Sequence, residues 1–213
     1  AEGSILFEVN KPIWGTCPSS NNDCNDLYFS EYAEGSSNNK YFEIFNPTPN
    51  TIALSNYTIY LSGNGGSFTN LFISNDSISS GGVYVISTDQ ADGIILSAAD
   101  TVLAFPSVAH FNGDDAMILT NGSDTIDVIG VPGVDPGSSW SVGTGSTKDY
   151  TLVRKSTVVN GTKDWSNGSN EWDVYPQNTW TNINQHSSSC IVTPSNVTFA
   201  VDMNNVTATY SSV

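Results

Sequence analysis

Alternation of hydrophobic and polar residues predicts a β-hairpin over residues 27–47. Strict alternation in the first arm places Phe29 and Glu31 on the same face of an extended strand. The connecting residues 33–39 are small or polar and include a glycine, which is typical of a turn. Pro47 ends the second arm, because proline cannot donate the hydrogen bond that a central strand requires.

Short strand-like runs recur after the hairpin, and turn dipeptides of Gly and Asn separate them. These runs cover residues 52–61, 70–78, 82–87, 101–105, 116–120, 125–130 and 150–154. Their spacing predicts an all-β fold, an antiparallel β-sandwich with long irregular loops. No long window keeps the helical i, i+3, i+4, i+7 spacing, so we expect little helix, with a single turn near residues 89–92.

Two long segments, residues 130–148 and 159–189, lack such strand patterns. The second is rich in large aromatic residues, which indicates that it folds back and packs on the sandwich. An alternative is that exposed rings stack on a glycan or contact another partner. The residues that would do so are Trp140, Trp165, Trp172 and Trp180.

The pattern divides the chain into three parts. Residues 1–26 hold a short apolar run, expected to form a first strand, and a segment with two cysteines. Residues 27–193 hold the β-sandwich. A new alternating strand starts within residues 194–213, and we expect it to open a second β-module.

The chain has few charged residues, and most of them are acidic. Six Lys and Arg residues against 21 Asp and Glu residues give a net charge of −15. This charge repels phosphate backbones, so we expect no nucleic-acid partner. No run approaches the apolar length of a membrane span, so no direct membrane insertion is expected. A chain that starts at Ala1 without Met indicates a processed, exported protein.

The cysteines are Cys17, Cys24 and Cys190. Cys17 and Cys24 flank a short loop of Pro, Ser, Asn and Asp residues, and this spacing predicts a local disulfide. The same two thiols lack the CxxC spacing of zinc or redox sites. Cys190 could be free, or could pair with either of the others across the domain.

An acidic turn suggests a cation site. Asp114 and Asp115, with Glu34 of the hairpin nearby, offer oxygen ligands of the kind that calcium binds, so a structural calcium ion is the one cofactor considered. The alternative is a turn in which the carboxylates accept backbone N–H bonds.

Glu31 and Glu43 lie mid-strand among aromatic residues, where a carboxylate requires a partner. Paired carboxylates also occur in glycosidases, but the loops carry no matching set of partners. We expect a structural ion pair with Arg154 or Lys155 instead.

Catalytic motifs are absent from the sequence. It contains no GxSxG, GxxxxGK[ST], GxGxxG or HExxH motif, so nothing supports a serine hydrolase, a nucleotide site or a zinc protease. We predict no catalytic residue.

Seven stretches, in order along the chain, carry a resemblance to a known family. They are LYFSEYAEGSSNNKYFEIFNPT, LSNYTIYL, GGVYVIS, FNGDDAMILTNGSDTIDVIG, DPGSSWSVG, DYTLVRK and EWDVYPQNTWTNINQH. On these stretches, residues 27–186 resemble the lamin tail domain, in the version found in secreted multidomain proteins of Bacteroidota. The resemblance implies an immunoglobulin-like β-sandwich without catalytic machinery, exported by type IX secretion.

Three Asp-Ser/Thr-aliphatic triplets are similar to the O-glycosylation acceptor pattern of the same bacteria. Their hydroxyl residues are Ser77, Thr101 and Thr125.

We therefore expect a non-catalytic accessory, adhesion or protein-interaction module that is extracellular or on the cell surface. Its partners would be other domains of a longer chain, a surface protein or a glycan. One alternative is the N-terminal accessory domain of an extracellular nuclease or phosphoesterase whose catalytic domain follows residue 213. Another alternative is a glycan-binding module.

Overall fold

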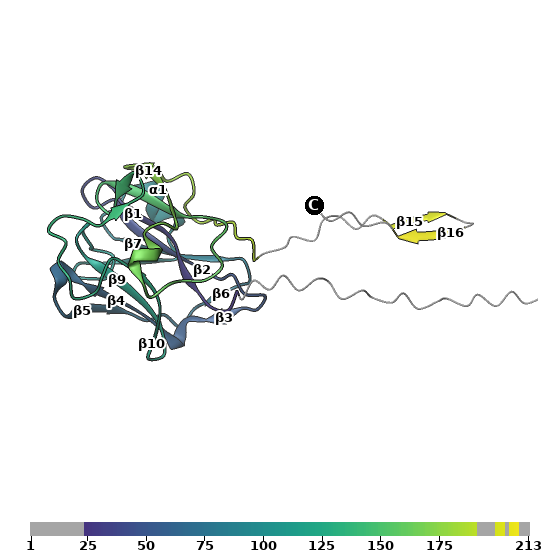
Figure 1. Ribbon diagram of the computed structural model, residues 1–213, viewed down its shortest axis with the longest axis horizontal. Coiled ribbons are helices and arrows are strands. Elements are labelled where there is room, and N and C mark those ends of the chain that lie inside the picture. The colour runs from purple at the N-terminus through teal and green to yellow at the C-terminus, as the bar shows by residue number, and fades with distance from the viewer. Residues whose placement is uncertain (1–23, 191–198, 203–204, 209–213) are drawn as a thin grey trace, which may run out of the picture.

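The computed structural model describes residues 24–190, 199–202 and 205–208. The strand predicted near the N-terminus and Cys17 lie outside the described residues. The described part contains two main β-sheets, and the predicted all-β sandwich is confirmed (Figure 1).

The larger sheet has six strands in the order β14-β13-β1-β2-β7-β8. All neighbours are antiparallel except β7 and β8, which run parallel. The strands are β1 (Tyr28–Glu34), β2 (Lys40–Phe45), β7 (Val83–Thr88), β8 (Thr101–Leu103), β13 (Tyr150–Arg154) and β14 (Trp172–Pro176).

The smaller sheet has four strands in the order β10-β9-β4-β5, and shorter elements connect the two sheets. Its strands are β4 (Tyr57–Ser62), β5 (Phe68–Phe72), β9 (Ala116–Asn121) and β10 (Asp124–Ile129). Three two-stranded ladders pair β3 (Ile52–Ala53) with β6 (Ser77–Ile78), β11 (Ser141–Val142) with β12 (Gly145–Ser146), and β15 (Phe199–Asp202) with β16 (Asn205–Ala208). The helical elements are η1 (Leu54–Asn56), η2 (Gly63–Gly65), α1 (Gly93–Ala98) and α2 (Trp165–Gly168).

The main hydrophobic core lies between the two sheets. It brings Phe42 and Ile44 of the six-stranded sheet together with Ile59 and Leu119 of the four-stranded sheet. A second, smaller core lies on the other face of the six-stranded sheet, where Tyr41 packs with residues of α1 and of the segment after β14. Because both faces of the larger sheet are covered, every residue of β1 and β2 is buried.

The predicted hairpin is confirmed, but a β-bulge changes its alternation. The register between β1 and β2 shifts between Phe29 and Glu31. Phe29 therefore packs in the main core, whereas Glu31 bonds to Tyr41 on the opposite face. The prediction that these two residues share a face is wrong, because an inserted residue reverses the order of the faces.

Helix is scarce, as predicted, but the first α-helix begins later than expected. Asp92 caps α1 by accepting a hydrogen bond from the Ile94 backbone N–H at 2.9 Å. The predicted turn at residues 89–92 therefore precedes the helix. The β15–β16 ladder lies within the 194–213 segment, for which a second β-module stays a prediction.

Candidate functional site

The hairpin loop and the turn before β9 lie side by side, as the sequence suggested, and Lys40 joins them. Glu34 and Lys40 are paired residues at the end of β1 and the start of β2. The Lys40 Nζ donates to the Phe111 carbonyl at 2.6 Å and to Asn112 Oδ1 at 2.9 Å, and it lies 3.4 Å from Glu34 Oε1. The three ammonium protons thus have three oxygen acceptors in a buried position.

The acidic turn is held by backbone hydrogen bonds. Asp115 accepts from the backbone N–H of Asn64 at 2.9 Å and from that of Asn112 at 2.7 Å. Among the residues that the structure describes, no three His, Cys, Asp or Glu side chains come together in a way that could hold a metal ion. Glu34, Asp114 and Asp115 are thus not gathered as a calcium ligand set. The positive charge beside Glu34 is the Lys40 ammonium.

Glu31 and Glu43 form a buried carboxyl pair. They are directly opposite across β1 and β2 and are 1% and 0% exposed. Tyr41 donates its hydroxyl proton to Glu31 at 2.7 Å, and Ser30 donates to Glu43 at 2.7 Å. Burial raises the pKa of Glu31 to about 7. Burial, with the nearby charge of Glu31, raises the pKa of Glu43 to about 8.

The segment after β14 covers this carboxyl pair. Glu43 Oε2 accepts a hydrogen bond from the Asn184 backbone N–H at 2.8 Å. Two residues further along, the His186 ring packs edge-on against Phe45 of β2, with 4.7 Å between ring centroids. Desolvation lowers the pKa of His186 to about 4, so the imidazole is uncharged at neutral pH.

The ion pair predicted between these glutamates and Arg154 or Lys155 is wrong. Arg154 Nη2 instead donates to both carboxylate oxygens of Asp127 at 2.7 Å, and both side chains are fully buried. Lys155 donates to a backbone carbonyl. A bidentate carboxylate suits the planar guanidinium better than the glutamates on the far face of the sheet.

Asp127 has further donors in addition to Arg154. The backbone N–H groups of Phe29 and Thr162 each donate to it at 2.9 Å. The Arg154 guanidinium lies 4.5 Å from the centre of the Trp172 ring. This cluster links β10 of one sheet to β1 and β13 of the other, so its role is structural.

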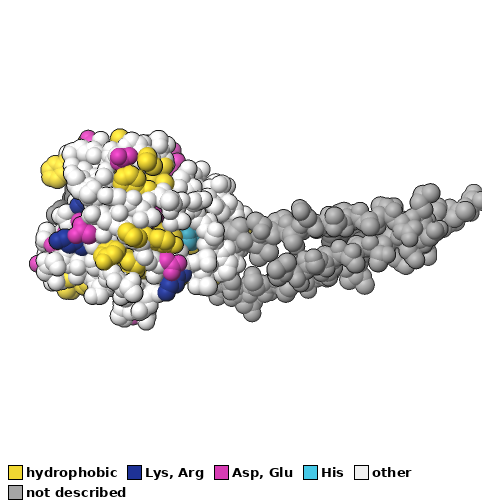
Figure 2. Space-filling view, turned by 90° about the horizontal axis from the view of Figure 1, so that it is seen from above, with side chains coloured by type: hydrophobic (Ala, Val, Ile, Leu, Met, Phe, Trp, Pro, Cys, Tyr) yellow, Lys and Arg dark blue, Asp and Glu magenta, His cyan; other side chains and the backbone are white. Residues whose placement is uncertain are grey.

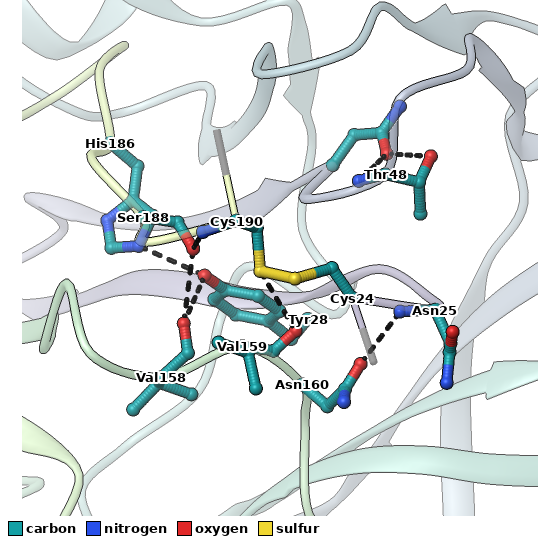
Figure 3. Close-up of a disulfide and its surroundings, with 11 residues drawn as sticks. Cys24, Asn25, Tyr28, Thr48, Val158, Val159, Asn160, His186, Ser188 and Cys190 are labelled. Atoms are coloured by element: carbon teal, nitrogen blue, oxygen red, sulfur yellow. Dashed lines mark hydrogen bonds between the residues drawn. A yellow bond between two sulfur atoms is a disulfide. The ribbon is translucent and has the colours of Figure 1, made fainter. Parts of the chain in front are cut away.

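The disulfide joins Cys24 to Cys190, so the predicted pairing of Cys24 with Cys17 is wrong (Figure 3). The C-terminal segment returns to the start of β1 because Tyr28 and Ser188 both donate to the Val158 carbonyl, at 3.1 and 3.2 Å. This return places two cysteines that are 166 residues apart in contact. Sequence spacing carries no signal for such a contact.

The four tryptophans do not form an exposed platform. Trp165 and Trp172 are 6% and 3% exposed and belong to the main core, so neither can stack on a sugar. Trp140 and Trp180 are half-buried, and their indole N–H groups are buried. The prediction that the aromatic segment packs on the sandwich is therefore confirmed. The alternative, stacking on a glycan, is wrong for Trp165 and Trp172.

The three hydroxyls predicted as glycosylation sites differ in exposure. Ser77 is exposed, whereas Thr101 and Thr125 are half-buried. The Thr101 hydroxyl also hydrogen-bonds to that of Tyr84 at 2.6 Å. Ser77 is the most accessible of the three.

An uncharged edge strand, which the sequence patterns did not single out as a site, carries the largest exposed side chains of the smaller sheet. β5 lies at one edge of that sheet and has no neighbour on its outer side among the described strands. On β5, Leu71 is 63% exposed and Phe68 49%, and Ile73, directly after the strand, is 52% exposed. The signal in the sequence is that residues 44–75 contain no acidic or basic side chain.

A groove lies beside this edge. It has a volume of about 420 Å³ and is lined by residues between β4 and β5, by the first residue of β5 and by the segment after β10: Gly65, Gly66, Ser67, Phe68, Pro132 and Gly133. Figure 2 shows one face of the molecule, where hydrophobic side chains form several groups and a few acidic and basic side chains lie among them. We call Phe68, Leu71 and Ile73 the β5 patch.

No helix in the described part of the chain is long and apolar enough to cross a membrane. The disulfide is of the kind that forms in an oxidising environment.

Comparison with known families finds one match. The family model described as Lamin Tail Domain matches residues 20–133, which is more than half of the chain. No curated protein matches the sequence.

Proposed function

Because the chain belongs to the lamin tail domain family, we propose that it is a non-catalytic interaction module of an exported protein, and that it binds a protein partner through the β5 edge. Domains of this family are immunoglobulin-like and not typically enzymatic. The observation that carries the proposal is the uncharged, hydrophobic edge strand.

An edge strand presents unpaired backbone N–H and C=O groups, which can accept a strand from another protein. Soluble proteins usually protect such an edge with charged side chains or proline. β5 has neither, although the chain as a whole carries a charge of −15. A charge-free edge lets a partner approach without the repulsion that the rest of the surface exerts on acidic proteins.

The cell surface or the extracellular space is the proposed location. The Cys24–Cys190 disulfide supports it, because structural disulfides persist in oxidising compartments and are rare in the cytosol. The exposed Ser77 of an Asp-Ser-Ile triplet supports a bacterial exported version of the family.

A charge placed on the edge tests the proposal. The chain is immobilised and exposed to the cell-surface fraction of its source organism, and the retained proteins are identified by mass spectrometry. Leu71→Lys should abolish retention of the specific partner. Val102→Lys is the matched control, because Val102 is 44% exposed on a different sheet.

Equal retention by the wild type and Leu71→Lys would contradict a role for the β5 edge. Hydrolysis of phosphodiester or glycoside substrates by the purified chain would contradict the non-catalytic part of the proposal.

A further inference from the structure

Three reactive groups meet in the Lys40 cluster, and the proposed interaction at β5 uses none of them. Lys40 supplies a primary amine, Asn112 a carboxamide and Glu34 a carboxyl group. The amine nitrogen lies 2.9 Å from the amide oxygen of Asn112 and 3.4 Å from a carboxylate oxygen of Glu34. An amine that contacts both an amide and an acid supplies the components of a transamidation.

We propose that Lys40 and Asn112 become joined by an intramolecular isopeptide bond, with Glu34 as the proton carrier. The Lys40 ammonium gives a proton to the Glu34 carboxylate, and the neutral Nζ attacks Cγ of Asn112. An Nζ–Cγ bond forms and the Cγ–Nδ2 bond breaks. One further Nζ hydrogen passes through Glu34 to the leaving nitrogen, which departs with the first proton as ammonium. No oxidant or reductant is consumed.

The fold holds the amine where this attack requires it. Pairing of Lys40 with Glu34 at the open end of the hairpin fixes the carboxyl beside the amine. A hydrogen bond of 2.6 Å to the Phe111 carbonyl holds Nζ next to the residue that precedes Asn112 in the chain. Fixing both reactants in this way converts a slow bimolecular reaction into an intramolecular one.

The surroundings favour the proton transfer that frees the amine. Phe111 is fully buried and stacks on the buried Tyr32 ring at 4.5 Å, so one side of the cluster is apolar. Burial raises the pKa of Glu34. A low dielectric disfavours the charged forms of both groups, so the neutral amine with a protonated carboxyl becomes easier to reach than in water. Asn112 itself is exposed, which gives the released ammonium a path to solvent.

The bond would join the two sheets covalently. Lys40 begins β2 of the six-stranded sheet, and Asn112 lies in the turn that leads into β9 of the four-stranded sheet. Such a link is distinct from the disulfide, because reductants do not break it.

Mass spectrometry of the intact, reduced full-length chain tests the proposal. The wild type should be lighter than its sequence by one ammonia, and a digest should contain one branched peptide that holds both Lys40 and Asn112. Lys40→Arg and Glu34→Gln should each show the full sequence mass. Glu171→Gln, a half-buried acid elsewhere, should keep the loss.

Two results would overturn the proposal independently of whether any variant folds. The first is a wild-type chain with its full sequence mass. The second is an ammonia loss without a branched peptide that persists in Lys40→Arg, because that loss would come from succinimide formation at one of the Asn-Gly dipeptides. Cross-linking that survives in Glu34→Gln would overturn the role of Glu34. Since β5 is not involved, these results are independent of the Leu71→Lys binding test.

Discussion

The buried ionisable side chains of this domain are stabilised in three different ways. Lys40 is surrounded by oxygen acceptors, and Arg154 is paired with Asp127. Within the described residues no cationic side chain forms an ion pair with Glu31 or Glu43, so this pair is neutralised by bound protons. Protons, unlike an ion pair, are lost when the pH rises.

The stability of the domain should therefore fall as the pH rises above about 4.5, and between pH 6.5 and 8.5 carboxylates of ordinary pKa no longer contribute to the fall. Glutamates that titrate near the ordinary value of 4.5 in the unfolded chain hold their protons to about 7 and about 8 when folded. The folded state then binds more protons, so the stabilisation is complete below pH 4.5 and is lost as the pH rises through these values. We expect the free energy of unfolding, measured in urea, to drop by on the order of 2 kcal/mol between pH 6.5 and pH 8.5.

Glu43→Gln should reduce this pH dependence. The amide keeps an oxygen that can accept the Asn184 N–H but no longer titrates, so the slope should fall to about half. His186 opposes this trend only weakly: its pKa is lowered to about 4 in the fold, and the unfolded imidazole, half protonated at pH 6.5, loses its remaining proton in the lower part of the window. An unchanged slope would show that the pair does not titrate as proposed.

At the scale of elements, the alternation of hydrophobic and polar residues predicted the positions of most strands, but it did not predict the bulge in β1 or the presence of β14. β13 forms over the predicted residues Tyr150–Arg154, because a short apolar run between turns has few alternatives. β14 was missed, since its five residues lie among Asn, Gly and Pro and are stabilised by pairing with β13. The bulge in β1 depends on its pairing with β2, and the Asp127 partner of Arg154 depends on a contact between the sheets. The local pattern of residues encodes neither.

Loss of the Arg154–Asp127 pair should loosen the contact between the sheets. Asp127→Ala leaves the buried guanidinium only its longer contact to Glu171, 3.6 Å from Nε, and we expect a loss of about 3 to 5 kcal/mol of unfolding free energy. Asp124→Ala on the same strand is the control, because Asp124 is exposed and should change stability by less than about 0.5 kcal/mol. Chemical denaturation of both variants at pH 7 would measure the difference, and equal values would contradict the structural role.

For the whole molecule, the disulfide closes the fold on itself. It joins Cys24, four residues before β1, to the end of the segment that covers the carboxyl pair, across a sequence separation of 166 residues. Cysteine spacing could not predict a loop of this length, because it favoured pairing of Cys24 with the neighbouring Cys17. The position of the Lys40 cluster was only partly predictable. The sequence suggested that the hairpin loop lies near the acidic turn, but it did not indicate a contact between Lys40 and Asn112.

Removal of this disulfide should destabilise the domain by about 3 to 5 kcal/mol, because the unfolded chain regains the freedom of a long loop. Cys190→Ser should lower the melting temperature, and wild type in reductant should behave in the same way. Cys17→Ser should leave the Cys24–Cys190 bond intact, as peptide mapping without reduction would show. Loss of that bond in Cys17→Ser would contradict the pairing.

The same connection determines how the domain would carry mechanical load. A pulling force applied to the chain before Cys24 and after Cys190 passes from one sulfur to the other. The β-ladders between the two cysteines bear none of the tension, so the sandwich would stay folded while the chain on either side of it is stretched. Once the bond is reduced, the same force would act on β1 from one end and on the segment after β14 from the other.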